Sequence, residues 1–124
     1  MYNEAMQIII KAKNFQLTES LEGFINDKIG KLEKFAKTLK SDSMDIFVEI
    51  EKETNHHRKG DLFIANLQIN LPGKNLMAKA RGEDLNKAII EAKDELEIEI
   101  KKHKLKTVEL PRRQIRKAAQ EETF

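Results

Sequence analysis

The 124-residue sequence has no cysteine and no tryptophan, and only two prolines and five glycines. Without cysteine, disulfide frameworks, thiol nucleophiles and Cys-based zinc sites are excluded. No apolar run approaches the roughly 20 residues that cross a bilayer. The amino-terminal stretch also lacks the basic start and long apolar segment of a signal peptide. These absences predict a cytoplasmic protein without a membrane partner.

Charged residues make up 35% of the sequence and hydrophobic residues 40%, which is enough for one solvated domain around a single core. The net charge of +2 is unevenly distributed. Basic and acidic residues balance over residues 1–60 at ten each, and acidic residues prevail over 61–100 by eight to five. Residues 101–124 carry eight basic against three acidic residues. This segment is typical either of an arm that binds a polyanion or of a solvated tail.

The spacing of apolar residues predicts four strands and two helices. Thr18 is the predicted N-cap of the first helix, because its hydroxyl accepts from backbone amides and Glu19 favours the positive helix end. The elements in chain order are a strand at 6–11, a helix at 18–39, strands at 46–51, 62–71 and 76–81, and a helix at 83–104.

The order of elements predicts an α+β domain. The strand-helix-strand start predicts two parallel strands, and the short later connections predict an antiparallel meander. Both helices have one apolar stripe, so both are expected on one face of a four-stranded mixed sheet. We expect a domain over residues 1–106 and a basic, flexible tail over residues 107–124, in which Pro111 stops any helix.

A ladder of lysines spaced three apart lies on the first predicted helix. It moves from the edge of the apolar stripe to the outer face, so that a nucleic-acid backbone would meet a row of counterions. An ordinary solvated helix face explains the ladder equally well, because Asp27 and Glu33 lie nearby. Lys28 is close enough to the core for its stem to lie on apolar surface while its charge reaches water.

Further basic clusters end the second helix, end the last strand and occupy the tail. Lysines at a helix C-terminus also complement the helix dipole. We expect Lys11 to share a sheet face with Lys79 and Arg81, and the separate clusters to converge into one continuous surface for a polyanion. The candidate RNA-binding residues are Lys28, Lys31, Lys34, Lys37, Lys79, Arg81, Lys87, Lys93, Lys101, Lys102, Lys104, Arg112 and Arg113. The sequence lacks the interleaved aromatics of a single-strand stacking surface, which favours structured RNA.

The sequence offers little for catalysis or metal binding. His56 and His57 are adjacent imidazoles, which rarely converge on one ion, and an exposed loop explains them better. The acidic stretch from Glu91 to Glu99 is explained by a solvated face with pairs such as Glu97 and Lys101. Phosphate-binding glycine motifs, zinc-protease motifs and nucleophile elbows are absent. We expect no enzyme activity, metal, cofactor or small-molecule substrate.

Several short strings, in their order and spacing, resemble one known family over residues 6–106. They are Asn14 with Leu17–Leu21, Lys31–Phe35, Val48–Lys52, Leu71–Gly73, Gly82–Leu85 with Ala88 and Ile89, and Lys102–Lys104. The chain resembles the ribosome hibernation-promoting factors and ribosome-associated inhibitors, also called ribosomal subunit interface proteins. Glu95 and Ile98 stand where the family usually has basic residues, and Ala12 replaces a common glycine.

The resemblance implies a β-α-β-β-β-α fold similar to double-stranded-RNA-binding domains. It also implies a site on the small ribosomal subunit, where family members fill the transfer-RNA and messenger-RNA channel and contact ribosomal RNA through both helices. Translation is then blocked by occupancy, and inactive, hibernating ribosomes of stressed or stationary-phase cells are stabilised. By position, Lys28, Lys31 and Lys34 match the basic cluster of the family's first helix, and Lys101, Lys102 and Lys104 match that of the second.

The chain resembles a short form that lacks the dimerisation domain of long members, and a free monomer is expected. We predict that its tail follows the messenger path, drawn there by Arg112, Arg113, Arg116 and Lys117. The alternative is a small-ligand regulatory module or a protein-interaction adaptor of the same fold. Its binding would be insensitive to salt and would need a pocket between subunits.

Overall fold

The structure, a computed structural model, describes residues 7–36, 45–54, 61–71, 73–106 and 115. Its elements are β1 (Gln7–Lys13), α1 (Glu19–Gly30), α2 (Glu33–Ala36), β2 (Asp45–Thr54), β3 (Asp61–Leu71), β4 (Lys74–Gly82) and α3 (Leu85–Lys104). The predicted order of strands and main helices is confirmed. Residues discussed above that lie outside the described part are Lys37, His56, His57, Pro111, Arg112, Arg113, Arg116 and Lys117.

The four strands form one mixed sheet in the order β1-β2-β3-β4. β1 and β2 are parallel, with Ile8 opposite Ile46, and the following two pairs are antiparallel. This confirms the parallel pair and the meander. Because side chains alternate between sheet faces, each strand presents one apolar and one more polar face.

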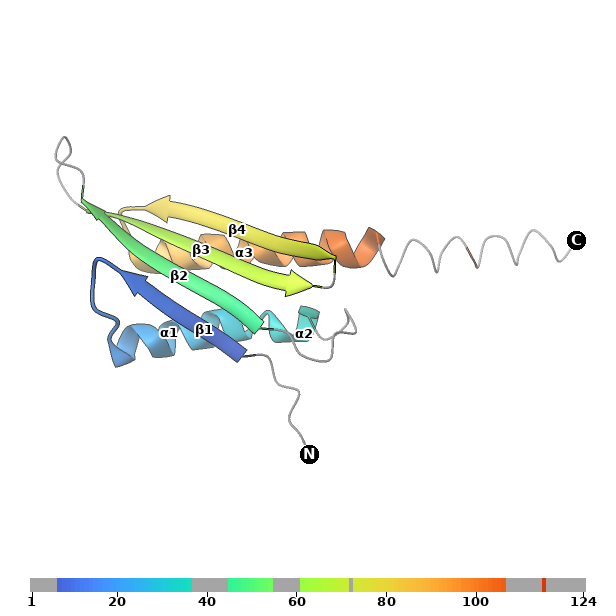
Figure 1. Cartoon of the computed structure of the whole chain (residues 1–124), viewed down its shortest axis with the longest axis horizontal. Coiled ribbons are helices and arrows are strands. Elements are labelled where there is room, and N and C mark those ends of the chain that lie inside the picture. Colours follow the sequence, from blue (N-terminus) through green and yellow to red (C-terminus); the bar gives the residue numbers. More distant parts are fainter. Residues whose placement is uncertain (1–6, 37–44, 55–60, 72, 107–114, 116–124) are drawn as a thin grey trace, which may run out of the picture.

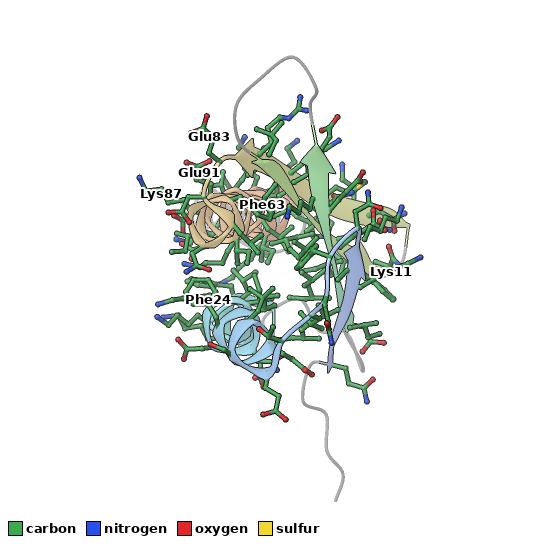
Figure 2. The ribbon with its side chains drawn as sticks, turned by 90° about the vertical axis from the view of Figure 1, so that its left-hand side faces the viewer. Lys11, Phe24, Phe63, Glu83, Lys87 and Glu91 are labelled. Atoms are coloured by element: carbon green, nitrogen blue, oxygen red, sulfur yellow. The ribbon has the colours of Figure 1, made fainter. Side chains whose placement is uncertain are left out.

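Both main helices cover the same face of the sheet, as Figures 1 and 2 show. The inward side chains of β2 and β3, such as Val48 and Leu67, are buried there against Ile25 of α1 and Leu96 of α3. Lys11 lies on the opposite, uncovered side, which we call the open sheet face (Figure 2). The buried core of the described residues is wholly apolar, so it positions the helices without polar contacts.

Helix α1 begins as predicted but ends early. The backbone N–H of Leu21 donates to Thr18 Oγ1 at 3.1 Å, so Thr18 is the N-cap. At the other end the Leu32 N–H donates to the Ile29 carbonyl at 3.0 Å, three residues back, which tightens the chain after Gly30. The prediction of one continuous helix to residue 39 is therefore wrong, and α2 follows as a separate turn.

The start of α3 and the β3–β4 turn follow from local chemistry. Asp84 caps α3, its carboxylate accepting from the N–H groups of Asn86 and Lys87 at 3.0 and 3.3 Å. Gly73 has a φ of 76°, a left-handed conformation that favours glycine in the turn. α1 and α3 run in the same direction, so α2 and the C-terminal end of α3 lie at the same end of the domain (Figure 1).

Candidate nucleic-acid interface

The short helix α2 and the C-terminal end of α3 meet around the ring of Phe35. Nζ of Lys34, in α2, lies 5.1 Å from the centroid of this ring, and Nζ of Lys101, in α3, lies 4.8 Å from it. Lysines from the first and second predicted clusters, far apart in sequence, are therefore brought together. We call Lys31, Lys34, Lys101 and Lys104 the helix-end lysine cluster.

Two pockets lie at this end of the domain. A pocket of about 270 Å³ is lined by Gly30, Lys31, Glu33 and Lys34. A second, of about 400 Å³, is lined by Phe35, Ile100, Lys101, Lys104 and Leu105. Every member of the helix-end lysine cluster thus borders a concave surface, which a phosphate backbone can approach closely.

Lys28 lies deeper than Lys31 and Lys34 of the first-helix ladder. Its side chain is 31% exposed, and Nζ lies 3.8 Å from Asp27 and 5.7 Å from the centroid of the Phe24 ring. Figure 2 shows Phe24 on the side of α1 that faces α3. The stem of Lys28 therefore packs on an aromatic ring while its charge reaches solvent, as predicted.

Lys93 is held by carboxylates. Its side chain is 17% exposed, and Nζ lies 2.9 Å from Asp94 and 3.8 Å from Glu97. The Nζ of Lys101 donates to the same Glu97 at 3.0 Å, which confirms the predicted i,i+4 pair. Because two acids surround Lys93, it offers a phosphate little net positive charge.

Lys87 and Lys102 lie apart from the Phe35 ring. Lys87 is exposed at the N-terminal end of α3, on the side of Glu83 and Glu91 (Figure 2). Lys102 is exposed in the last turn of α3, and its Nζ lies 3.8 Å from Glu99. The first-turn location of Lys87 places it at the opposite end of α3 from the helix-end lysine cluster.

Lys79 and Arg81 lie on the open sheet face. The strand registers place Lys11, Glu49, Asn66 and Lys79 in one row across the sheet, which confirms that Lys11 shares this face. Arg81 pairs with Glu53 at 3.0 Å. This face is opposite to the helices, so the expectation of one continuous basic surface is wrong for these two residues. Their binding of RNA stays a prediction.

A third basic pocket was not predicted from the sequence. About 70 Å³ in volume, it is lined by Lys74, Leu76, Glu99, Lys102, His103 and Lys106. The start of β4 and the end of α3 meet there. Lys74 therefore lies near Lys102 and Lys106, although most of β4 and α3 separates them in the sequence. The sequence shows a basic residue, Lys74, directly after the Pro-Gly turn. Only the packing of β4 on α3 shows that this residue lies beside the lysines at the end of α3.

Two negative findings concern the residues that the structure describes. Among them, no group of three or more His, Cys, Asp or Glu side chains is arranged to hold a metal ion. None of the helices in these ranges is long and apolar enough to span a bilayer.

The fold and the basic helix ends define a small α+β domain suited to a polyanionic partner. Residues 8–108 match the profile of the family described as "Sigma 54 modulation protein / S30EA ribosomal protein". The match covers most of the sequence, and the chain belongs to this family.

Curated relatives agree with the family match. The chain is 31% identical over 99 residues to the ribosome hibernation promoting factor of Escherichia coli, covering 80% of this chain and 94% of that protein. It is 30% identical over 99 residues to the factor of the same name from Klebsiella oxytoca, with the same coverage of both chains. The ribosome hibernation promotion factor of Lactococcus lactis is 25% identical over 105 residues, which span 83% of this chain but only 52% of that protein.

Two solved structures share the fold. The N-terminal domain of Thermus thermophilus Protein Y superposes with a TM-score of 0.63 at 22% identity, covering 79% of this chain and 99% of that domain. A ribosomal subunit interface protein from Coxiella burnetii gives a TM-score of 0.64 at 18% identity, over 80% of this chain and 98% of that one. The predicted α+β architecture with helices on one face is thereby confirmed.

Proposed function

We propose that this chain binds the small ribosomal subunit, occupies the channel of messenger and transfer RNA, and keeps ribosomes inactive. It acts by occupancy, without catalysing a reaction. Family membership and the names of the relatives support this proposal. The structural observation that carries it is the approach of Lys34 and Lys101 to one ring, because it makes a single basic site from two helices.

The chemistry of the helix-end lysine cluster suits a phosphate backbone. Each ammonium group that meets a phosphate releases condensed counterions, so affinity falls steeply as salt rises. Lys31 and Lys34 are exposed and leave the core untouched, so their charge is available to a ligand. Among the described residues, Phe47 is the one aromatic side chain that is well exposed, so no row of aromatic rings is present there for a single strand to stack on. This favours structured RNA.

Helix capping explains only part of this arrangement. Lysines in a last helical turn each stabilise the helix by about 0.3–1 kcal/mol through the dipole. That effect is local to each helix and requires no contact between the two. Apolar packing of Phe35 on the core explains why α2 and α3 meet there. Because this packing places lysines of both helical segments side by side, we assign ribosomal-RNA contacts first to Lys31, Lys34, Lys101 and Lys104.

RNA binding by the other described candidate residues stays a prediction, and the structure divides them into two groups. Lys28 and Lys102 flank the cluster on α1 and α3, whereas Lys79, Arg81, Lys87 and Lys93 lie on other surfaces or among carboxylates. A ribosome-bound chain acts in the cytoplasm, and we propose that it is a monomer when free. The alternative of a regulatory module or adaptor is not favoured by the family match.

Competition with transfer RNA on purified small subunits tests the proposed function. The chain is incubated with small or large subunits, pelleted through a sucrose cushion, and assayed in parallel for displacement of labelled transfer RNA and for inhibition of cell-free translation. We expect pelleting with the small subunit, displacement and inhibition at matching concentrations. Equal pelleting with both subunits, or pelleting without displacement, contradicts the proposal.

A further inference from the structure

The pocket between α2 and α3 has a composition unlike that of its neighbours. Phe35, Ile100 and Leu105 supply an apolar lining, and Lys101 and Lys104 supply ammonium groups. No carboxylate lines it, whereas Glu33 lines the pocket beside Lys31 and Glu99 lines the one beside Lys102. Among these three pockets it is therefore the one that combines an aromatic ring with ammonium groups and has no acid in its lining. Glu97 lies outside the lining but pairs with Lys101 at 3.0 Å, so a phosphate must compete with this carboxylate.

We propose that this pocket binds a single unstacked nucleotide, with the base against Phe35 and the phosphate between Lys101 and Lys104. A nucleotide is the ligand that joins a planar apolar ring to an adjacent anion. The proposal rests on the proposed function, since the nucleotide is one extruded from folded ribosomal RNA. It adds recognition of a base to the backbone contacts of the helix-end lysine cluster.

The size of the pocket supports a base rather than an isolated anion. Its volume of about 400 Å³ lies within the range of small-molecule sites, roughly 300–1,000 Å³. The basic pocket at Lys74 and Lys102 holds only about 70 Å³ and has no aromatic lining. The smaller pocket is therefore suited to phosphate contacts, and we assign the base to the larger pocket that contains Phe35.

The ring of Phe35 is half-buried and already attracts cations. Contacts of ammonium groups with an exposed ring are weak, so a stacking base can displace them from its face. The flexible stems of Lys34 and Lys101 then let the same ammonium groups follow the phosphate. Stacking on an aromatic side chain depends little on base identity, so purines and pyrimidines both enter.

Nuclear magnetic resonance of the ¹⁵N-labelled full chain tests the pocket. Uridine and adenosine 5′-monophosphates, uridine, and inorganic phosphate are titrated separately. Both nucleotides are expected to shift the backbone signals of Phe35, Ile100, Lys101 and Leu105, and inorganic phosphate to shift them more weakly. Phe35→Leu, which keeps an apolar side chain, is expected to weaken nucleotide binding about ten-fold, as the loss of one stacked base does.

Two further variants make the result decisive. Phe47→Leu makes the same change on the open sheet face, and nucleotide affinity is expected to be unchanged. Lys104→Gln keeps the aromatic ring but removes one ammonium group. It is expected to weaken binding of the two monophosphates and to leave binding of uridine unchanged. If Phe35→Leu does not fold, the test rests on Lys104→Gln, whose binding of the monophosphates is compared with its binding of uridine.

Clear outcomes overturn the inference. Equal shifts with inorganic phosphate and with nucleotides, or no effect of either pocket variant, show a surface that attracts anions without holding a base. Pelleting of the wild-type chain with small subunits separates the two proposals. If it pellets while nucleotides leave the pocket signals unmoved, the pocket proposal fails and the proposed function stands; if it does not pellet, the proposed function itself fails.

Discussion

The open sheet face and the helix-end lysine cluster carry comparable numbers of basic residues but differ in their neighbours. On the sheet, Lys11, Lys13, Lys79 and Arg81 flank Glu49, Glu51 and Glu53 of β2. At the helix ends, Lys34 and Lys101 approach the ring of Phe35, and one carboxylate, Glu97, pairs with Lys101. The number of basic residues therefore does not distinguish the two regions. They differ in that a row of glutamates separates the basic residues of the sheet, whereas an aromatic ring lies between lysines of two helical segments.

Strand periodicity explains the balance of charge on the sheet. Glu49, Glu51 and Glu53 alternate with Val48, Ile50 and Lys52 along β2. All three glutamates therefore project from the open sheet face in the strand next to β1. Lys13 pairs with Glu49 at 3.5 Å, and Arg81 with Glu53 at 3.0 Å. Exposed pairs of this kind contribute only about 0–1 kcal/mol to stability, but they lower the charge that an RNA meets.

Charge reversal in the helix-end lysine cluster is expected to have the largest effect, and the same change on the open sheet face serves as its control. Lys31→Glu with Lys34→Glu should lower affinity for small subunits at least about 100-fold, because two phosphate contacts become repulsions. The matched control, Lys79→Glu with Arg81→Glu, should change affinity less than about three-fold. Pelleting measures both, and thermal melts check folding. Equal losses would show that the two regions do not differ in function.

The packing beneath the helix-end lysine cluster is the next target. Leu32 is fully buried between Lys31 and the start of α2, so Leu32→Ala should lower the free energy of unfolding by about 2–5 kcal/mol. Urea denaturation measures the loss, and Ile98→Ala, at an exposed position, should remain within about 0.5 kcal/mol of the wild type. A small loss for Leu32→Ala would show that this joint is not part of the cooperative core.

Deleting residues 107–124 tests whether positive charge outside both regions contributes. The deletion removes Arg112, Arg113, Arg116 and Lys117. If the tail follows the messenger path, inhibition of translation should weaken about ten-fold, since several ammonium and guanidinium contacts are lost. Unchanged inhibition rejects the predicted role of the tail and leaves the comparison of the two folded regions intact.

The smallest effect is expected at the N-terminal end of α1, far from Phe35. Thr18→Ala removes the hydroxyl that accepts from Leu21, so stability should fall by about 1 kcal/mol. Affinity of the folded protein for small subunits should not change. A loss of affinity with the fold intact would extend the site to this end of the helical layer.

Most of the architecture was predictable because local patterns determine it. The spacing of apolar residues predicted strands at 46–51 and 62–71, which contain the buried Val48 and Leu67. Thr18 was identified as a helix cap from its side chain and position. The break after Gly30 was missed because the apolar stripe continues through Leu32 and Phe35. Glycine weakened the helix more than the stripe suggested.

The site was less predictable because tertiary contacts decide it. The sequence identified lysines on both helices, but only the packing of α2 on α3 brings Lys34 and Lys101 to one ring. The reverse applies to Lys93, whose acidic partners Asp94 and Glu97 were readable at positions i+1 and i+4. Lys74 was missed because its nearness to Lys102 requires the β4–α3 contact.

Salt dependence of small-subunit binding tests the central claim most directly. Affinity is measured for the wild type and for Lys101→Gln with Lys104→Gln, and its logarithm is plotted against that of the salt concentration. The account predicts a steep negative slope for the wild type, reduced by about two for the variant, one for each lost phosphate contact. A flat wild-type plot, or the same slope for both proteins, would contradict it.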